Sequence, residues 1–254
     1  MAEILQSRIP HDLSPRRLPG IQPLELSQWL QLDDAYFPQM ALRRELIATQ
    51  RETVLALDPA ARPAAEELLE VVLGALDALP GFVVEAGSVL CPDGWREPID
   101  RSDPLAMLGR MVQEDLCLLE KRGADQEHVL TGAVLCFPAS WRLDEKFMRP
   151  LTAIHDPVAE YDADLAKRVQ RLFDAVRPDR PLWRSNALRY AAPDLHQPRS
   201  VTAPREKKGE QPYLRSERQS VLRLPESGAA VFSIHTYVVR AEGADAAPAA
   251  GDAA

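Results

Sequence analysis

The sequence predicts a single α+β domain built around an antiparallel sheet. Candidate strands mostly follow one another as hairpins, and candidate helices fall between these groups, which is not the pattern of a doubly wound parallel sheet. With 254 residues, of which 46% are apolar and 27% charged, the chain can bury a sizeable core. We expect an extended arm over residues 1–35, one folded domain over residues 36–240 and a disordered tail over residues 241–254.

Composition defines the two ends of the chain. Pro10, Pro15, Pro19 and Pro23 break any helix in the arm before it can nucleate. After Glu242 only Gly, Ala, Asp and Pro occur, and such a segment cannot bury enough apolar surface to order itself.

Two helices are predicted after the arm. Residues 39–56 follow Pro38, and residues 60–79 end before Pro80. The second helix has one apolar face, which is formed by Leu68, Leu69, Val72, Leu73, Leu76 and Leu79.

Shorter elements follow these helices. Residues 82–90 have the pattern of a strand, and the Pro-Asp-Gly sequence at 92–94 is typical of a turn. Pro104 opens a short helix over residues 105–112, with Asp103 as its N-cap. Two strands, over residues 115–119 and 129–137, are expected to pair around a polar loop.

The last part of the domain combines one helix with three strands. Leu165, Val169, Leu172 and Val176 repeat at spacings of four and three, which predicts a helix over residues 162–176. A strand is predicted over residues 182–190. Strands over 220–224 and 229–239 flank a Pro-Glu-Ser-Gly turn and form the clearest hairpin. Its second strand alternates, so Phe232 and Ile234 share one face while Val231 and His235 share the other.

Composition and motifs exclude several classes of function. The net charge of −8 disfavours a nucleic-acid partner. We expect no membrane-spanning segment, because the sequence contains no apolar run of 18 residues. The first 19 residues lack the apolar core of a secretory signal. Cys91, Cys117 and Cys136 are far apart, so we expect free thiols in a reducing cytoplasm. Neither a nucleotide-binding glycine motif nor a Gly-x-Ser-x-Gly elbow occurs.

Histidines are the remaining source of chemistry. No two of the five lie three or four residues apart, which disfavours a zinc site. His155 is the best placed, because it follows an apolar run and a helix should end before Pro157. A single imidazole with apolar surroundings is what heme iron takes from a protein. For any lone histidine the alternative is a structural residue whose ring is hydrogen-bonded in the core or at the surface.

Several blocks of sequence have a more specific pattern. Residues 132–141 read Gly-Ala-Val-Leu-Cys-Phe-Pro-Ala-Ser-Trp, and residues 154–158 read Ile-His-Asp-Pro-Val. Between them come Lys146 and an Arg-Pro-Leu sequence at 149–151, and upstream stands Gln-Glu-Asp-Leu at 113–116. Residues 214–225 read Leu-Arg-Ser-Glu-Arg-Gln-Ser-Val-Leu-Arg-Leu-Pro and run into the hairpin.

In order and spacing these blocks resemble the heme-dependent oxidative N-demethylase family, over roughly residues 21–239. The resemblance implies a PAS-like antiparallel sheet that holds heme b, with His155 as the iron ligand. It also implies a monooxygenase that demethylates small secondary amines with O₂ and releases formaldehyde. Electrons would come from NADPH through a separate flavin and iron–sulfur reductase.

The basic segment 199–223 contains further candidate residues. Seven Lys or Arg stand there against three Glu in an otherwise acidic chain. Arg215, Arg218 and Arg223 lie in the matching block and are candidates for binding heme propionates, or the segment docks an acidic reductase. Glu217 is a candidate catalytic residue, because a cationic amine needs a carboxylate nearby. The alternative is a solvated charged surface, with Glu217 in an ion pair with Arg215 or Arg218.

The chain also departs from the family pattern. Ala159-Glu160 replaces a Pro-Gly pair, Phe147-Met148 replaces Leu-Gly, and Ala187 replaces a Trp. These changes leave the substrate open. A PAS-like heme sensor or ligand-binding module without catalysis is the alternative function, and a family member that has lost heme is a third.

Overall fold

The computed structural model describes residues 3–14, 20–122, 127–155, 163–200, 202–203 and 209–241. Only the backbone is described for His155 and for residues 163–166. Apart from Ala241, the predicted disordered tail lies outside the described residues, as do the Asp156-Pro157 pair that follows His155 and most of the loop between residues 121 and 127. The predicted boundaries between arm, domain and tail therefore stay predictions.

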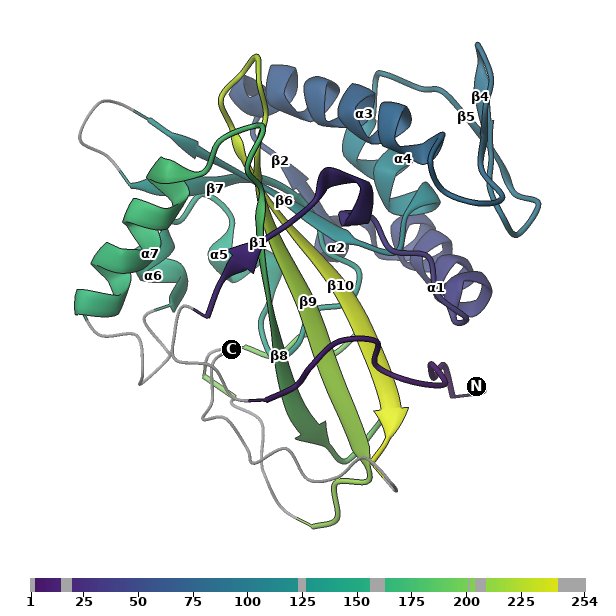
Figure 1. Cartoon of the computed structure of the whole chain (residues 1–254), viewed down its shortest axis with the longest axis vertical. Coiled ribbons are helices and arrows are strands. Elements are labelled where there is room, and N and C mark those ends of the chain that lie inside the picture. Colours follow the sequence, from purple (N-terminus) through teal and green to yellow (C-terminus); the bar gives the residue numbers. More distant parts are fainter. Residues whose placement is uncertain are drawn as a thin grey trace.

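A seven-stranded sheet forms the centre of the molecule, and every neighbouring pair in it is antiparallel (Figure 1). This confirms the predicted α+β class. In spatial order the strands are β1 (Gln22–Pro23), β8 (Leu182–Tyr190), β9 (Tyr213–Arg223), β10 (Ala230–Arg240), β6 (Asp115–Lys121), β7 (His128–Val134) and β2 (Leu55–Leu57).

The hairpin of β9 and β10 was predicted, and its register runs from Ala230 opposite Arg223 to Arg240 opposite Tyr213. The predicted pairing of β6 with β7 is also confirmed, and β10 extends the same sheet by pairing with β6. β9 begins at Tyr213 and not at residue 220. Its first half was missed because arginines interrupt the apolar alternation there.

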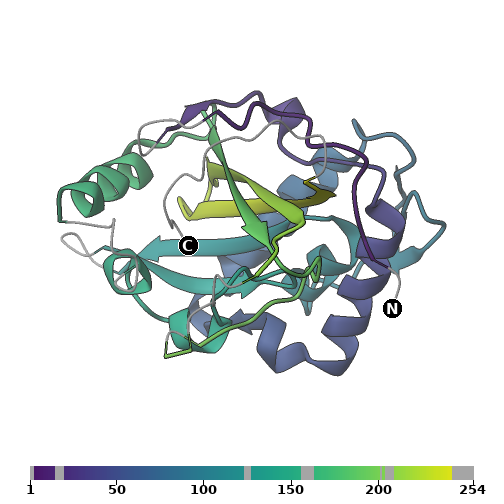
Figure 2. The ribbon, with the colours of Figure 1, turned by 90° about the horizontal axis from the view of Figure 1, so that it is seen from below.

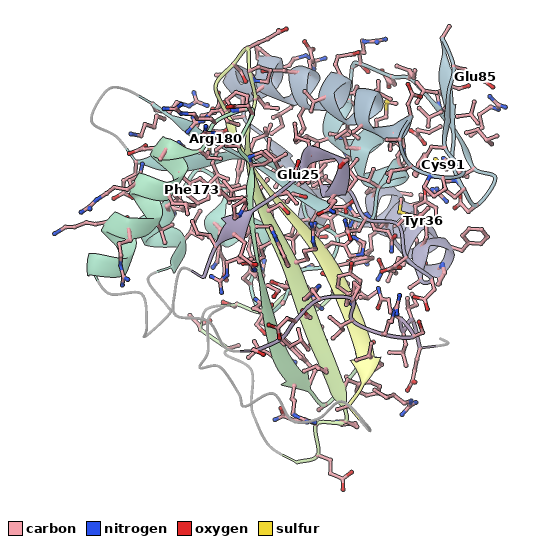
Figure 3. All side chains as sticks on the ribbon, in the orientation of Figure 1. Glu25, Tyr36, Glu85, Cys91, Phe173 and Arg180 are labelled. Carbon is pink, nitrogen blue, oxygen red and sulfur yellow. The ribbon has the colours of Figure 1, made fainter. Side chains whose placement is uncertain are left out.

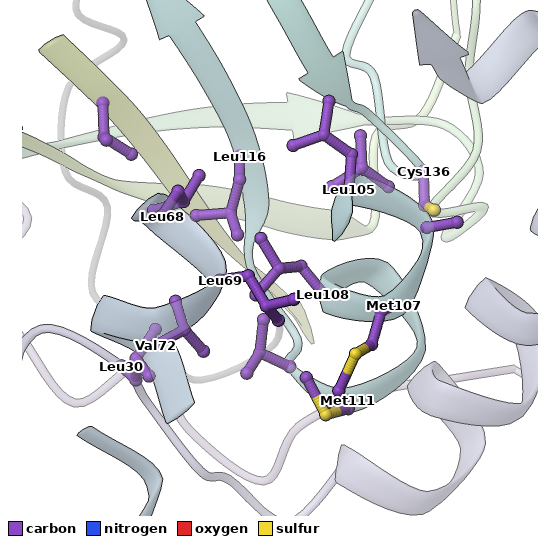
Figure 4. Packing of buried hydrophobic residues seen from close by; sticks show 14 of the residues in the cluster. Leu30, Leu68, Leu69, Val72, Leu105, Met107, Leu108, Met111, Leu116 and Cys136 are labelled. Atoms are coloured by element: carbon purple, nitrogen blue, oxygen red, sulfur yellow. The ribbon is translucent and has the colours of Figure 1, made fainter. Parts of the chain in front are cut away.

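One face of the sheet, here called the α4 face, packs against α1 (Tyr36–Thr49), α3 (Arg62–Leu76) and α4 (Pro104–Met111). Leu118, Leu222 and Val231 point to this face and join the same cluster of buried residues. Figure 4 shows leucines and methionines of α4 meeting Leu68, Leu69 and Val72 of α3. The apolar stripe predicted for the helix over residues 60–79 is buried from Leu68 to Leu76, but α3 ends at Leu76, so Leu79 lies outside it.

The predicted helix 39–56 is wrong at both ends. α1 begins at Tyr36 with Pro38 in its first turn, where proline costs no hydrogen bond. The helix is interrupted at Gln50 (φ −134°, ψ 35°) and resumes as α2 (Arg51–Val54). The last residues, Leu55–Leu57, are β2 and pair with β7, because the edge of the sheet offers hydrogen bonds there.

The predicted strand 82–90 is also wrong as a single element. A turn divides it into β3 (Val83–Val84) and β4 (Ser88–Leu90), which form a small sheet with β5 (Arg96–Pro98). Figure 3 shows Glu85 at this small sheet, and Cys91 beside Tyr36 where the sheet meets α1. The predicted turn at 92–94 is present, with φ 82° at Gly94.

Asp103 occupies the predicted N-cap position of α4 but makes no capping hydrogen bond. Its carboxylate instead accepts two hydrogen bonds from Arg51, at 2.8 and 2.9 Å. An ion pair across two helices thus replaces the local cap.

The other face of the sheet, here called the α6 face, packs against three short elements. They are α5 (Leu143–Lys146), α6 (Leu151–His155) and α7 (Ala163–Ala175), the last close to the predicted helix 162–176. Leu151 and Phe173 form a second apolar cluster with Val221 and Ala230, so α7 packs on the hairpin as predicted. In both views α7 and α1 lie at opposite ends of the molecule (Figures 1 and 2).

Within the described ranges, no helix combines the length and apolar character needed to cross a bilayer.

Candidate functional site

Strand alternation sorts the candidate residues of β9 onto two faces. Val221 packs with Leu151 of α6, and residues two apart on a strand share a face. Glu217 and Arg215 therefore point to the α6 face, together with Gln219 and Arg223. Arg218 points to the α4 face, where its guanidinium lies 4.9 Å from the ring of Trp183.

α6 is short, and side chains hold it at two points. At its start, the Glu127 carboxylate accepts hydrogen bonds from the amide (3.2 Å) and hydroxyl (2.7 Å) of Thr152. Just before His155, Lys146 donates from Nζ to the carbonyl oxygen of Ile154, at 2.7 Å. These contacts fix the turn of backbone that carries His155. His155 is the last residue of this segment that the structure describes, so the predicted helix end at His155 stays a prediction, and its imidazole lies outside the described residues.

Lys146 is an unusual cation for such a position. It is buried, and its ammonium lies 5.2 Å from the ring of Trp141. Burial lowers the pKa of Lys146 to about 8. The sequence block marked Lys146 but gave no role, whereas the structure shows it bracing α6.

Arg215 is 2% exposed and clamps two loops onto the sheet. It donates to the carbonyl oxygens of Leu195 (2.9 Å) and Phe137 (2.7 Å). Its Nε is buried and has no hydrogen-bond partner among the described residues. The guanidinium therefore keeps one donor available beside Glu217, whose Oε1 lies 3.7 Å from Nη2.

Glu217 lies at the middle of a polar group on the α6 face. Its Oε2 accepts hydrogen bonds from Asn186 Nδ2 (3.3 Å) and Gln219 Nε2 (3.0 Å). Thr236 of β10 pairs directly with Glu217 of β9. The buried Oγ1 of Thr236 has no hydrogen-bond partner within the described part of the chain. The alternative of an ion pair between Glu217 and Arg215 is confirmed, at 3.7 Å, whereas Arg218 lies on the other face of the sheet. The catalytic role of Glu217 stays a prediction.

The segment over residues 136–141 is held rigidly next to this polar group. Asp115 accepts hydrogen bonds from the amides of Cys136 (2.7 Å) and Phe137 (2.9 Å). Asp115 is itself paired at 2.7 Å with Arg43, which is fully buried. At Ser140 the backbone adopts φ 67°, and its Oγ is another buried atom without a partner in the described residues. A strained residue with an unsatisfied hydroxyl is typical of a binding site.

The other two candidate arginines already have partners. Arg218 is 7% exposed and donates to the carbonyl oxygens of Trp29 (3.1 Å) and Gln28 (2.8 Å). Arg223 binds the last turn of α7 through the carbonyl oxygens of Phe173 and Val176, and also that of Gly228. Burial lowers the pKa of both guanidinium groups. Propionate binding by these two residues stays a prediction, and Arg218 faces away from α6.

A second polar network occupies the α4 face. His235 contacts the carboxylates of Glu114 and Asp33, each at 3.0 Å. His11 of the arm contacts Ser216 Oγ at 2.9 Å and lies edge-on to Tyr237. Ala187 pairs with Ser216, so this departure from the family pattern belongs to the α4 face and not to the surroundings of α6.

The α6 face suits heme in two respects. Near α6 it is apolar, through Leu151, Val221 and partly buried Phe232. Further along the strands it carries the polar side chains of Arg215, Glu217 and Thr236, of which Arg215 Nε and Thr236 Oγ1 are buried without partners among the described residues. A ligand or a water molecule can satisfy such atoms. A face that is apolar at one end and polar at the other matches heme, which has an apolar ring and two charged propionates on one edge.

The fold is an α+β domain whose antiparallel sheet has an α6 face that is apolar near α6 and polar around Glu217. A family model described as haem-dependent oxidative N-demethylase, alpha subunit-like, matches residues 20–253, and the chain belongs to this family. No curated protein matched the chain.

Sequence reasoning gave no site role to Thr236, to Ser140 or to Arg184 of β8. Alternation in β10 places Thr236 on one face with Ile234. That its hydroxyl has no partner among the described residues follows only from the assembled fold.

Proposed function

We propose that this chain is the heme b-binding component of an oxidative N-demethylase, a monooxygenase that acts on a small secondary amine with O₂. The observation that carries the proposal is the polar group around Glu217 on the α6 face, in a chain of this family. The reaction consumes the amine, O₂, two electrons and two protons. It yields the demethylated amine, formaldehyde and water.

His155 is the proposed iron ligand. Support comes from its place in α6, which Glu127 holds at Thr152 and Lys146 holds at Ile154. A ligand must keep its position while the metal changes charge, and a helix anchored at two points provides that. Heme, when bound, supplies the oxygen activation and oxidation that no side chain of this protein can perform.

Glu217 is the proposed partner of the substrate ammonium. Its two hydrogen bonds come from neutral amides, so its charge is only partly balanced by Arg215 at 3.7 Å. A half-buried carboxylate with spare charge attracts a cation more strongly than one exposed to water. Arg215 orients Glu217 and offers its free Nε to the ligand, while Arg218 and Arg223 hold the arm and α7 against β9.

The electron donor is proposed to be NADPH, through a separate flavin and iron–sulfur reductase. The family description names an alpha subunit, which supports a partner protein. Three buried free thiols, Cys91, Cys117 and Cys136, agree with a reducing, cytoplasmic setting.

The test is the absorption spectrum of purified protein titrated with hemin. Wild-type protein should bind one heme with a sharp Soret band, and His155→Ala should lose that band or shift it. A His155→Ala protein with a full, unshifted band would remove His155 as the ligand. His11→Ala is the matched control, because His11 lies on the α4 face and its loss should leave the band unchanged.

A further inference from the structure

Arg184 differs from the arginines of β9 because its guanidinium has no hydrogen-bond partner in the described part of the chain. It lies on β8 directly across from Gln219, and the next pair on the same face is Asn186 with Glu217. Arg184 therefore points to the α6 face. Among the described residues, no carbonyl or carboxylate accepts a hydrogen bond from its guanidinium, although the side chain is only partly exposed. Arg215, Arg218 and Arg223 each donate to at least two carbonyl oxygens.

The surroundings of Arg184 do not neutralise it. Glu217 is the one charged group whose field favours its protonated form, and burial acts in the opposite direction and lowers the pKa of Arg184. The carboxylate of Glu217 is already bound by Asn186 and Gln219 and lies near Arg215. A partly buried, unpaired cation costs free energy in the absence of a ligand.

The geometry of the Arg184 guanidinium limits the chemical class of ligand that it can bind. A guanidinium presents a planar fork of N–H donors, which fits a carboxylate bidentately. Apolar residues lie on one side of Arg184, because Leu182, two residues before it, packs with Phe173 of α7. Its ligand therefore needs a carboxylate next to an apolar body.

We infer that Arg184 binds a propionate carboxylate of the heme. The inference rests on the proposed heme function and adds to it the residue that recognises the acidic edge of the cofactor. It assigns this role to β8, where the sequence had suggested only the arginines of β9. Arg184 is a binding residue and takes no part in proton or electron transfer.

The experiment compares heme with its dimethyl ester, in which both propionates are neutral. Each is titrated into apo wild-type protein, Arg184→Leu and Arg184→Lys, and binding is followed by the Soret band and by tryptophan fluorescence. A charge-assisted hydrogen bond contributes enough that Arg184→Leu should bind heme about tenfold to a hundredfold more weakly. Its affinity for the dimethyl ester should equal that of wild type, and Arg184→Lys should lie between the two for heme. Arg180→Leu, in the exposed turn before β8, is the matched control.

The outcomes separate this inference from the function on which it rests. Wild-type protein that binds neither ligand would overturn both. Heme affinity unchanged in Arg184→Leu would overturn only the role of Arg184. Equal losses for heme and ester would show a structural role and likewise overturn it. In the apo protein the urea midpoint of Arg184→Leu should not fall, since removing an unpaired cation takes away no bond.

Discussion

At the scale of single residues, His235 shows how much charge this fold keeps inside. It is 1% exposed, and both of its ring nitrogens lie 3.0 Å from a carboxylate oxygen, of Glu114 and of Asp33. Only the imidazolium can donate from both nitrogens at once. Burial alone would lower the pKa of His235, but the hydrogen bonds to Asp33 and Glu114 and their charges raise it to about 9.

This pKa predicts a dependence of stability on pH. The folded state holds the proton up to about pH 9, whereas unfolded histidine releases it near pH 6.5. The contribution of His235 is therefore complete below about pH 6.5 and is lost as the pH rises to about 9. We expect the free energy of urea unfolding to fall across this window in wild-type protein.

The matched variant is His235→Gln, which cannot titrate. It should be roughly 3 kcal/mol less stable at pH 6.5, because the buried carboxylate of Glu114 and the partly buried carboxylate of Asp33 lose their cation. Its stability should also change less between pH 6.5 and 9 than that of wild type. Tyrosine and cysteine ionisation affects both proteins equally, so parallel pH profiles would contradict the assignment.

His11 lies on the same face as His235, but its pKa is shifted in the opposite direction. Burial, followed by the charges of Arg218 and His235, lowers the pKa of His11 to about 4. Ser216 donates its hydroxyl hydrogen to the carbonyl oxygen of Asn186, so His11 must donate from Nε2 to Ser216 Oγ. Its neutral ring packs edge-on to Trp183 and Tyr237 and helps to hold the arm on the sheet.

At the scale of elements, the turn between α5 and α6 contains a residue with a strained backbone conformation, which a substitution can relieve. Met148 adopts φ 59°, a left-handed conformation that costs a residue with a Cβ about 1–2 kcal/mol. Its amide donates to the carbonyl oxygen of Leu130 at 2.9 Å, which holds the turn in this conformation. The resembling sequences have glycine here, and the backbone explains why.

Met148→Gly should raise the free energy of unfolding by about 1 kcal/mol, because glycine adopts this conformation without strain. Met148 is 45% exposed, so little buried apolar surface is lost. Urea unfolding measures the change. Met148→Ala is the control: it keeps the Cβ and should gain nothing, so an equal gain in both variants would show that the side chain and not the backbone was responsible.

The same elements show what the sequence could predict. The hairpin was predictable because Val231 to Val238 alternate cleanly around a Pro/Gly turn. The first half of β9 was not, because Arg215 and Arg218 are buried only through carbonyl partners on distant loops. Helix 39–56 failed because β2 forms only when β7 is beside it.

For the candidate site, the sequence motifs identified candidate residues but did not show to which face of the sheet their side chains point. Once β9 is known to start at Tyr213, alternation alone puts Arg215 and Glu217 on one face and Arg218 on the other. The absence of a partner for Arg184 among the described residues depends on the distances between loops, which no local pattern contains. The same holds for Lys146, whose partner Ile154 belongs to another helix.

At the scale of the whole molecule, the two faces of the sheet carry different polar networks. The α4 face holds buried charges in pairs, as in His235 with Asp33 and Glu114. The α6 face holds the polar group in which Glu217 accepts hydrogen bonds from Asn186 and Gln219. Buried polar atoms without partners in the described chain occur on both faces, for example on Ser220 and on Thr236, so these atoms alone do not distinguish the two faces.

The burial of arginines in β9 limits how a partner protein can dock. The basic segment 199–223 was a candidate docking surface, but Arg215 and Arg218 are 2% and 7% exposed. Those two residues cannot meet a partner without unfolding the strand. Of the described basic residues in this segment, Arg199 is exposed and remains a candidate.

Turnover is expected to require a second protein. Oxygen activation at a heme needs two electrons per cycle, whereas NADPH delivers them as a hydride, so a flavin must separate the pair. The sequence contains no dinucleotide-binding glycine motif and no cysteine cluster for an iron–sulfur relay. The family description as an alpha subunit agrees with a division of labour between chains.

The measurement is formaldehyde release by heme-loaded protein given NADPH, O₂ and a panel of secondary amines. Without another protein we expect no sustained release, and with a flavin and iron–sulfur reductase we expect turnover. Hydrogen peroxide, which replaces O₂ together with the two electrons and two protons, is the control that separates a missing electron donor from an inactive site, because it should allow formaldehyde release without NADPH or a reductase. If docking is electrostatic, the rate with reductase should fall as salt rises from about 0.05 to 0.5 M, since surface charges are screened. Sustained, NADPH-dependent release by the isolated chain would contradict the expectation and would mean that this fold binds the nicotinamide by a motif that its sequence does not reveal.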